Sequence, residues 1–130
     1  MRGAAVTAPG AAAAAGLVPG CRVWLGRKPG GPPLVGHREA ALLAGIERTG
    51  SIKEGAKLAG VSYRTAWAAV RAMERALGRP VVASRTGGPG GGASRLTDET
   101  RELLRIYREL ERHVTAQVER AYAAAATSRP

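Results

Sequence analysis

The sequence predicts a small, mainly α-helical protein with one short β-hairpin and a long C-terminal helix. Three observations carry this prediction. Apolar residues recur at helical spacing from His37 to Leu77, a glycine-rich stretch separates two short runs between residues 81 and 96, and a heptad-like pattern follows Thr97. We therefore divide the chain into four parts: a flexible tail (1–20), a folded domain (21–96), a long helix (97–126) and a short tail (127–130).

Composition limits the size of the core and indicates the class of partner. The 130 residues include 26 Ala and 18 Gly but no Phe, so they support one thin core and no large enzyme cleft. The net charge is +10, which favours a polyanionic partner. Residues 36–97 carry +6 of this charge, whereas 98–130 are balanced, so the folded domain is the basic part.

The N-terminal residues indicate neither export nor a membrane anchor. Arg2 is followed by Ala, Gly and Pro, without the Leu or Val run of a secretory signal, and no segment approaches 18 strongly apolar residues. Cys21 is the only cysteine, which rules out a disulfide within the chain and fits a reducing compartment. We expect a cytoplasmic protein.

The elements follow in order from residue 21. Residues 21–25 have a strand pattern, and the turn-rich stretch 26–33 means that this strand needs a partner later in the chain. A first helix begins near His37 and ends near Thr49 and Gly50, with Leu42, Leu43 and Ile46 on its apolar face.

Two further helices follow with almost no linker. Ser51 and Glu54 form a capping-box pattern, in which Ser51 accepts from the first-turn amides and Glu54 reaches back to the Ser51 amide. We expect Ile52, Ala56 and Leu58 to point inward. After Gly60, Ser62 caps a third helix that runs to about Leu77. Its apolar face comprises Ala66, Val70, Met73 and Leu77, with Arg64, Arg71 and Arg75 off that face.

A hairpin and a long helix complete the predicted fold. Residues 81–83 and 93–96 form its strands, and glycines between 87 and 92 form a mobile loop. Thr97 begins the last helix, with Asp98 and Glu99 in its first turn. Its apolar seam is spaced for contact with a second copy and comprises Leu103, Tyr107, Leu110, Val114, Gln117, Ala121 and Ala124.

The second and third helices, joined by a tight turn, have the pattern of a helix-turn-helix. Ala56 is small where the helices cross, and Gly60 supplies the left-handed conformation of the turn. The start of the third helix can then enter a DNA major groove, where Arg64 donates to guanine. The hairpin that follows adds a wing, so the predicted fold class is a winged helix-turn-helix followed by a long C-terminal dimerisation helix.

These residues resemble the N-terminal DNA-binding domain of the ModE family of molybdate-responsive regulators and, more distantly, LysR-type winged helices. The resemblance covers roughly residues 22–125. It rests on Gly50-Ser51-Ile52, Ala56-x-Leu58-Ala59-Gly60-Val61-Ser62-Tyr63-Arg64-x-Ala66-Trp67, Thr86-Gly87-Gly88-x-Gly90-Gly91-Gly92 and Leu96-Thr97. It implies a dimer, joined through the last helix, that binds a palindromic operator.

The chain departs from that family pattern in three ways. The molybdate-binding domains that normally follow the long helix are absent before Pro130, so no oxyanion site is carried over and any effector would be sensed by another polypeptide. Ser84 and Arg85 stand in the reverse of the family order, and one step along a strand reverses the face of the side chain. Thr100 replaces a Gly, a change that a helix tolerates.

Several residues have a functional and a structural interpretation. Arg64 could read a base, hold a phosphate or be solvated, and we favour a DNA contact. For Trp67 we favour packing between helices over DNA contact. The glycine-rich loop lacks the following Gly-Lys-Ser/Thr of a nucleotide cradle, so we interpret it as a wing tip along the DNA backbone. His37 and His113 are expected at the surface, and the chain has no nucleophile paired with a base.

The resulting prediction is a sequence-specific transcription regulator that binds double-stranded DNA as a homodimer, without enzyme activity, cofactor or metal. The alternatives are an architectural DNA-coating protein and a DNA-binding subunit paired with a separate sensor protein. The expected DNA-binding residues are Ser51, Lys57, Ser62, Tyr63, Arg64, Thr65, Arg71, Arg85, Thr86, Gly88 and Arg95. The expected dimerisation residues are Leu103, Tyr107, Leu110, Val114, Gln117 and Ala121.

Overall fold

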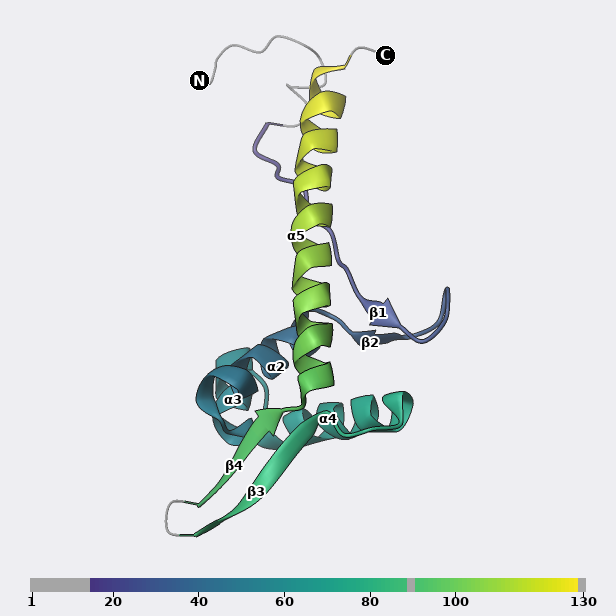
Figure 1. Cartoon of the computed structure of the whole chain (residues 1–130). Coiled ribbons are helices and arrows are strands. Elements are labelled where there is room, and N and C mark those ends of the chain that lie inside the picture. The colour runs from purple at the N-terminus through teal and green to yellow at the C-terminus, as the bar shows by residue number, and fades with distance from the viewer. Residues whose placement is uncertain (1–14, 89–90, 129–130) are drawn as a thin grey trace. The chain divides into compact units, whose positions relative to one another are not determined.

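The computed structural model describes residues 15–88 and 91–128, without the side chains of residues 85–92. In this described part, four helices and two antiparallel hairpins follow one another in the order expected of a winged helix-turn-helix with a long last helix, which confirms the predicted fold class (Figure 1). The elements are β1 (Leu25–Gly26), β2 (Pro33–Val35), α2 (His37–Thr49), α3 (Ile52–Ala59), α4 (Tyr63–Leu77), β3 (Val82–Gly88), β4 (Gly91–Leu96) and α5 (Asp98–Thr127).

The chain forms two compact units. One is Val23–Glu109, and the other joins the segment up to Arg22 to the chain from Leu110 onward. The boundary therefore falls within α5, so the first part of this helix belongs to the unit that holds the helix-turn-helix.

The first hairpin differs from the predicted strand at residues 21–25. Only Leu25 and Gly26 form β1, and their partner is β2, the run directly after the turn, with Leu25 opposite Val35. The Gly31 amide donates to the Lys28 carbonyl at 3.0 Å and closes this turn. Sequence reasoning missed β2 because three residues are too few to show an alternating pattern.

Helices α2 and α3 are packed unusually closely. Gly45 and Gly55 are both buried, and a Cβ added to Gly45 would lie 2.8 Å from the Gly55 Cα. Helix α2 ends at Gly50, whose φ of 73° is left-handed. The absence of both Cβ atoms allows the two backbones to approach at this point. The sequence predicted a different close crossing, that of α3 and α4 at Ala56, and the Ala56 side chain is buried.

The prediction that Leu58 points inward is wrong. Its side chain is 56% exposed, whereas Ile52 and Ala56 are buried as expected. In an α-helix, residue 58 lies about 120° away from the direction of residue 52, while residue 59 lies almost beneath it. Ala59 accordingly packs against the core in place of Leu58.

The core of the Val23–Glu109 unit combines residues of β2, the three helices α2, α3 and α4, the wing and the start of α5. Its largest fully buried side chains are Tyr107, Leu42, Leu43, Ile46 and Met73. The Tyr107 hydroxyl donates to the Val23 carbonyl at 3.0 Å. A chain without Phe therefore uses a tyrosine as its central aromatic residue, with the hydroxyl satisfied by the backbone.

The wing is attached to the helix-turn-helix through the backbone. The Ser94 amide of β4 donates to the Gly50 carbonyl at 2.9 Å, directly before the helix-turn-helix. The Thr97 amide donates to the Val81 carbonyl at 3.1 Å and closes the base of the hairpin. The strands extend to Gly88 and from Gly91, beyond the predicted ends of the hairpin. Residues 89 and 90 of the predicted mobile loop lie outside the described residues, as does most of the predicted N-terminal tail.

The start of α5 is capped as predicted. The Thr100 amide donates to the Thr97 hydroxyl at 3.3 Å, and the two threonine hydroxyls lie 2.8 Å apart. Thr100 is buried, so the residue that stands in place of the family glycine takes part in the cap.

Within the described residues, no helix combines the length and the apolar character needed to cross a membrane.

Candidate nucleic-acid interface

The turn between α3 and α4 has the predicted helix-turn-helix geometry. Gly60 has a φ of 74°, and the Val61 amide closes the turn by donating to the Ala56 carbonyl at 3.0 Å. The Ser62 hydroxyl caps α4, accepting from the Thr65 amide at 3.0 Å and donating to the Thr65 hydroxyl at 2.9 Å. Ser62 and Thr65 thus hold each other at the first turn of α4.

The outward face of α4 is basic. Arg64, Ala68, Arg71 and Arg75 are all exposed and follow one another at spacings of four, three and four residues, which places them on one side of the helix. Arg64 makes no hydrogen bond or ion pair with any residue that the structure describes. We call these four residues the α4 stripe.

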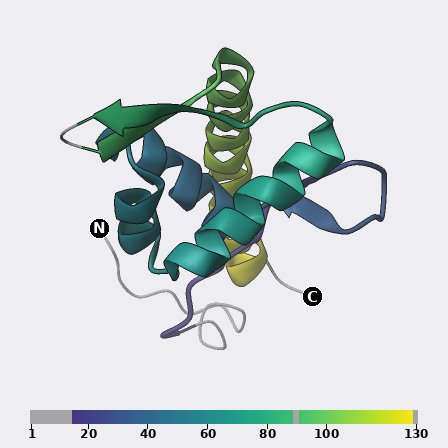
Figure 2. The same cartoon turned by 90° about the horizontal axis from the view of Figure 1, so that it is seen from below.

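The wing lies on the same side of its unit as α4. Figure 2 views the molecule from below, with α4 and the β3–β4 hairpin both toward the viewer. Cα register pairs Ala83 with Arg95 and Arg85 with Ala93, so positions 85 and 95 share one face of the hairpin. Val82 and Leu96 occupy the opposite face and are buried, whereas Arg95 is exposed, so the face that holds Arg95 is the outward one.

Only part of the predicted wing contact can be placed. Arg95 is exposed on β4. Arg85, Thr86 and Gly88 lie in β3, but the side chains of the first two are outside the described residues.

The capping box predicted at Ser51 is half formed. The Ser51 hydroxyl accepts from the Glu54 amide at 3.1 Å, as predicted. The return bond is absent because the Ser51 amide donates to the Thr49 hydroxyl at 3.2 Å. The Glu54 carboxylate instead faces Lys57, with Oε2 and Nζ 3.5 Å apart, so this candidate DNA-binding lysine has an exposed carboxylate partner.

Aromatic packing on α4 joins three residues that lie one helical turn apart. The Tyr63 and Trp67 rings meet edge to face, with centroids 6.3 Å apart and an interplanar angle of 87°. The Arg71 Cζ lies 5.1 Å from the centroid of the Trp67 ring, a cation–π contact. Trp67 is partly buried against the core, as favoured from the sequence, while Tyr63 is 52% exposed. Sequence reasoning missed the Trp67–Arg71 pair, although the four-residue spacing is its signal.

The charges of α5 neutralise one another, as their interleaving predicts. Arg105 donates to both carboxylate oxygens of Glu102, at 3.1 and 2.6 Å, and this hydrogen bonding holds the pKa of Glu102 below its usual range.

The two histidines of the chain, His37 and His113, are exposed, as predicted. Within the described residues, no three histidine, cysteine or acidic side chains gather in a way that could hold a metal ion.

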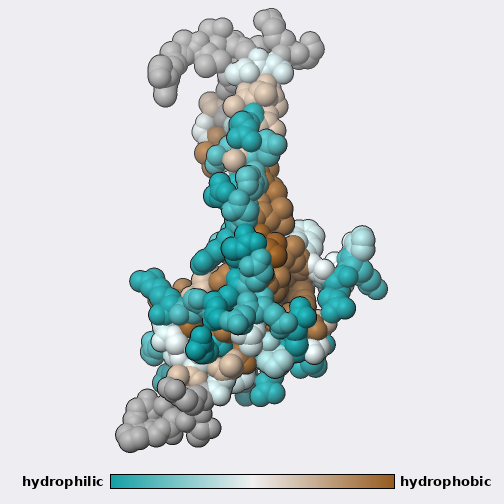
Figure 3. All heavy atoms as spheres, viewed as in Figure 1, coloured by the Kyte–Doolittle hydropathy of each residue, from teal (hydrophilic) through white to brown (hydrophobic). Residues whose placement is uncertain are grey.

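The predicted dimerisation residues divide between the core and the surface. Tyr107 is fully buried and Leu103 packs against the core, so both belong to the helix-turn-helix unit. Leu110 is 37% exposed, Val114 is partly exposed, and Gln117 and Ala121 are exposed. Figure 3 shows hydrophobic residues along one side of α5.

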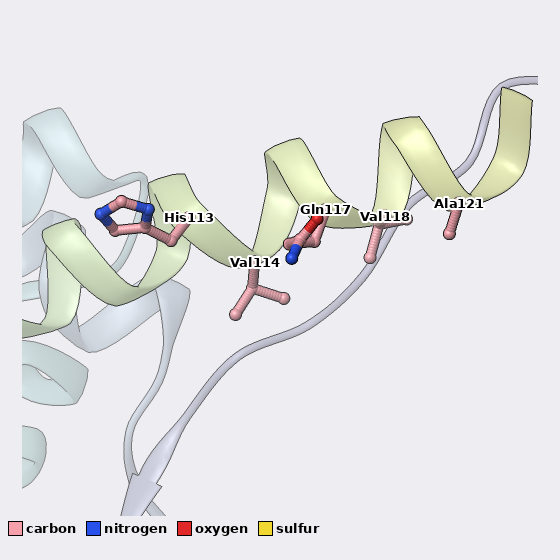
Figure 4. Close-up of a pocket in the computed structure, with 5 residues that line it drawn as sticks. All are labelled: His113, Val114, Gln117, Val118 and Ala121. Atoms are coloured by element: carbon pink, nitrogen blue, oxygen red, sulfur yellow. The ribbon is translucent and has the colours of Figure 1, made fainter.

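In the other unit, a shallow apolar groove lies along α5. It is lined by His113, Val114, Gln117, Val118 and Ala121, and Figure 4 shows the last two and Val114 pointing to the same side of the helix. The Tyr122 hydroxyl donates to the Leu17 carbonyl at 3.4 Å, so the described part of the N-terminal segment runs beside this helix.

Comparison with known proteins places these features in a family of regulators. Residues 37–101 match the family described as bacterial regulatory helix-turn-helix protein, lysR family. Over 70 residues the chain is 46% identical to the transcriptional regulator ModE of Yersinia pestis, a match that covers 54% of this chain and 27% of that protein.

Two further relatives give the same result. The molybdenum-pterin-binding protein MopB of Rhodobacter capsulatus is 43% identical over 77 residues, covering 59% of this chain and 28% of MopB. The DNA-binding transcriptional dual regulator ModE of Escherichia coli (strain K12) is 41% identical over 70 residues, covering 54% and 27%. The chain thus matches under a third of the length of these relatives, and the predicted resemblance is confirmed.

Proposed function

Because the chain belongs to the LysR-type family of bacterial regulatory helix-turn-helix proteins, we propose that it is a transcription regulator that binds double-stranded DNA sequence-specifically. The α4 stripe carries this proposal. It presents Arg64 in the first turn of a capped helix. The Arg64 guanidinium has no hydrogen bond or ion pair with the described part of the chain, so it can donate two hydrogen bonds to a guanine edge.

The remaining basic residues supply affinity rather than selectivity. Arg71 on α4, Arg95 on β4 and Lys57 on α3 are exposed, and each phosphate contact they make would release condensed counterions. The position of Arg95 on the outward face of the wing favours contact with the DNA backbone.

The protein would act as a homodimer on an inverted repeat. Four exposed or partly exposed residues of α5 recur at spacings of four, three and four, as in a helix that packs on a second copy. We call them the α5 seam: Leu110, Val114, Gln117 and Ala121. A two-fold axis through such a contact would set the two α4 helices on half-sites of opposite orientation.

This function is tested by incubating the purified protein with sheared genomic DNA from the organism that encodes it and sequencing the fragments that are retained. A salt concentration of about 200 mM is used because binding through phosphate contacts alone is largely suppressed at that concentration. We expect enrichment of a few inverted repeats and loss of that enrichment in Arg64→Ala. Uniform recovery would favour an architectural DNA-coating protein. Recovery that requires a co-purified second polypeptide would favour a subunit of a two-polypeptide sensor.

A further inference from the structure

We propose that Trp67 is a positioning residue that holds the Arg71 guanidinium on the face of α4, ordered in advance for contact with a DNA phosphate. This inference rests on the proposed function, because it assigns to one pair of side chains a part in the DNA contact. The proposal depends on the contact between Trp67 and Arg71, because neither residue type alone indicates this role.

The Trp67 ring is a fixed platform for a cation. Trp67 packs against the core cluster, and the Tyr63 ring meets it edge to face at 6.3 Å between centroids. The Arg71 Cζ lies 5.1 Å from the ring centroid, within the range in which the negative face of an indole attracts a guanidinium. A solvent-exposed arginine is thereby given a preferred position before any partner arrives.

Contact with the Trp67 ring leaves the hydrogen-bond donors of the Arg71 guanidinium available. A guanidinium uses its flat face against an aromatic ring and its edge for N–H donors, so contact with Trp67 does not consume them. Glu74, three residues further on, could have neutralised Arg71, but its carboxylate accepts from the Val81 amide at 3.1 Å. Arg71 forms no ion pair with the residues that the structure describes, so its charge is available to an external anion.

The location of Arg71 fits a phosphate better than a base. It belongs to the α4 stripe with Arg64 and lies two helical turns, about 10 Å, further along the axis. The major groove is about 12 Å wide, so a helix that places Arg64 at the base edges carries Arg71 toward the backbone that borders the groove. The ordering by Trp67 would lower the entropy lost when Arg71 binds there.

The first measurement uses free protein and no DNA. Heteronuclear ¹⁵N relaxation of the arginine Nε–H groups reports side-chain order, and Arg64 on the same exposed stripe serves as the matched control. We expect Arg71 to be more ordered than Arg64 in the wild type and to become as mobile as Arg64 in Trp67→Leu. Equal mobility of the two arginines in the wild type would overturn the proposal.

The second measurement is a double-mutant cycle on a short, fluorescently labelled duplex of mixed sequence, titrated between about 50 and 200 mM salt. Arg71→Ala should lower the slope of log affinity against log salt by about 0.9. Trp67→Leu should weaken binding about twofold to fivefold in the wild-type background and not at all in Arg71→Ala. Trp67→Phe, which keeps an aromatic face, should restore most of the affinity and also covers the case in which the Leu variant does not fold.

The outcomes separate this inference from the function on which it rests. If the wild type binds the duplex but Trp67→Leu weakens binding equally with and without Arg71, Trp67 has a purely structural role and the inference fails alone. If the wild type shows no salt-dependent binding, the proposed function and the phosphate contact fail together.

Discussion

Gly45 and Gly55 meet where α2 crosses α3, so closely that a Cβ on Gly55 would lie 2.8 Å from the Ile46 nitrogen and 3.0 Å from the Gly45 carbonyl carbon. Two of the atoms that block this space are backbone atoms, which cannot rotate away as a side chain does. The absence of both Cβ atoms therefore sets the separation of α2 and α3. Since α4 follows α3 through a tight turn, this contact also affects the position of the α4 stripe.

Replacement of Gly55 by alanine should destabilise the fold. Overpacking typically costs about 1–3 kcal/mol, and the higher helix propensity of alanine returns about 1 kcal/mol, so we expect a net loss of up to about 2 kcal/mol. Urea denaturation followed by circular dichroism measures the change. Gly20→Ala is the control, because a Cβ there meets no atom within 4 Å and should leave the midpoint almost unchanged.

A second glycine is required for its backbone conformation alone. Gly60 has a φ of 74°, and a Cβ at this position would meet nothing within 4 Å. Gly60→Ala should therefore lose about 1 kcal/mol of unfolding free energy through left-handed strain, whereas Gly60→Asn should lose less because asparagine tolerates this region. Thermal and urea unfolding of the two variants distinguish the effects, and equal losses would contradict an origin in φ.

Tyr107 offers a test of where α5 belongs. Tyr107→Phe removes the hydroxyl that donates to the Val23 carbonyl and leaves that carbonyl without this partner, which should reduce the unfolding free energy by about 0.5–1.5 kcal/mol. Because the ring is fully buried within its own chain, self-association measured by sedimentation should not change. A shift in the association constant at unchanged stability would instead place Tyr107 in a contact between copies.

The helical elements were predictable because their signals are local. The ends of α2, α3 and α4 coincide with Gly50, Gly60 and Gly78, each at positive φ, and such caps are visible in the sequence. The Ser62 cap and the basic stripe follow from local pattern in the same way. Leu58 was misplaced because a helix of eight residues offers too few apolar positions to determine its inward direction.

What could not be predicted depends on contacts between distant residues. Tyr107 fits the heptad spacing of α5 as well as it fits the core, and only its packing near Val23 distinguishes the two. The Ser51 amide was expected to donate to the Glu54 carboxylate. It donates instead to the hydroxyl of Thr49, which lies at the end of the preceding helix. The Gly45–Gly55 crossing likewise joins two helices whose approach no single segment encodes.

The two arginines of the proposed interface should differ in what they determine. Arg64→Ala should lower the preference for operator over mixed-sequence DNA by about 1–3 kcal/mol, because it removes a base contact. Arg95→Ala should weaken binding to both duplexes alike and reduce the salt slope by about 0.9, because it removes a phosphate contact. Fluorescence anisotropy with both duplexes measures the ratio of operator affinity to mixed-sequence affinity for each variant. If the two variants change this ratio equally, Arg64 and Arg95 do not differ as a base contact and a phosphate contact.

The α5 seam is expected to form the contact between two copies of the chain. Val114→Glu places a charge in the middle of the seam, and burying it without a partner against a second copy would be strongly unfavourable, so we expect a shift from dimer to monomer in sedimentation velocity. Ala123→Glu is the matched control, since residue 123 is exposed and lies away from the seam by helical spacing. Operator affinity should fall with Val114→Glu because a monomer engages one half-site only. If both variants remain dimeric, copies of this chain associate through a surface other than the α5 seam.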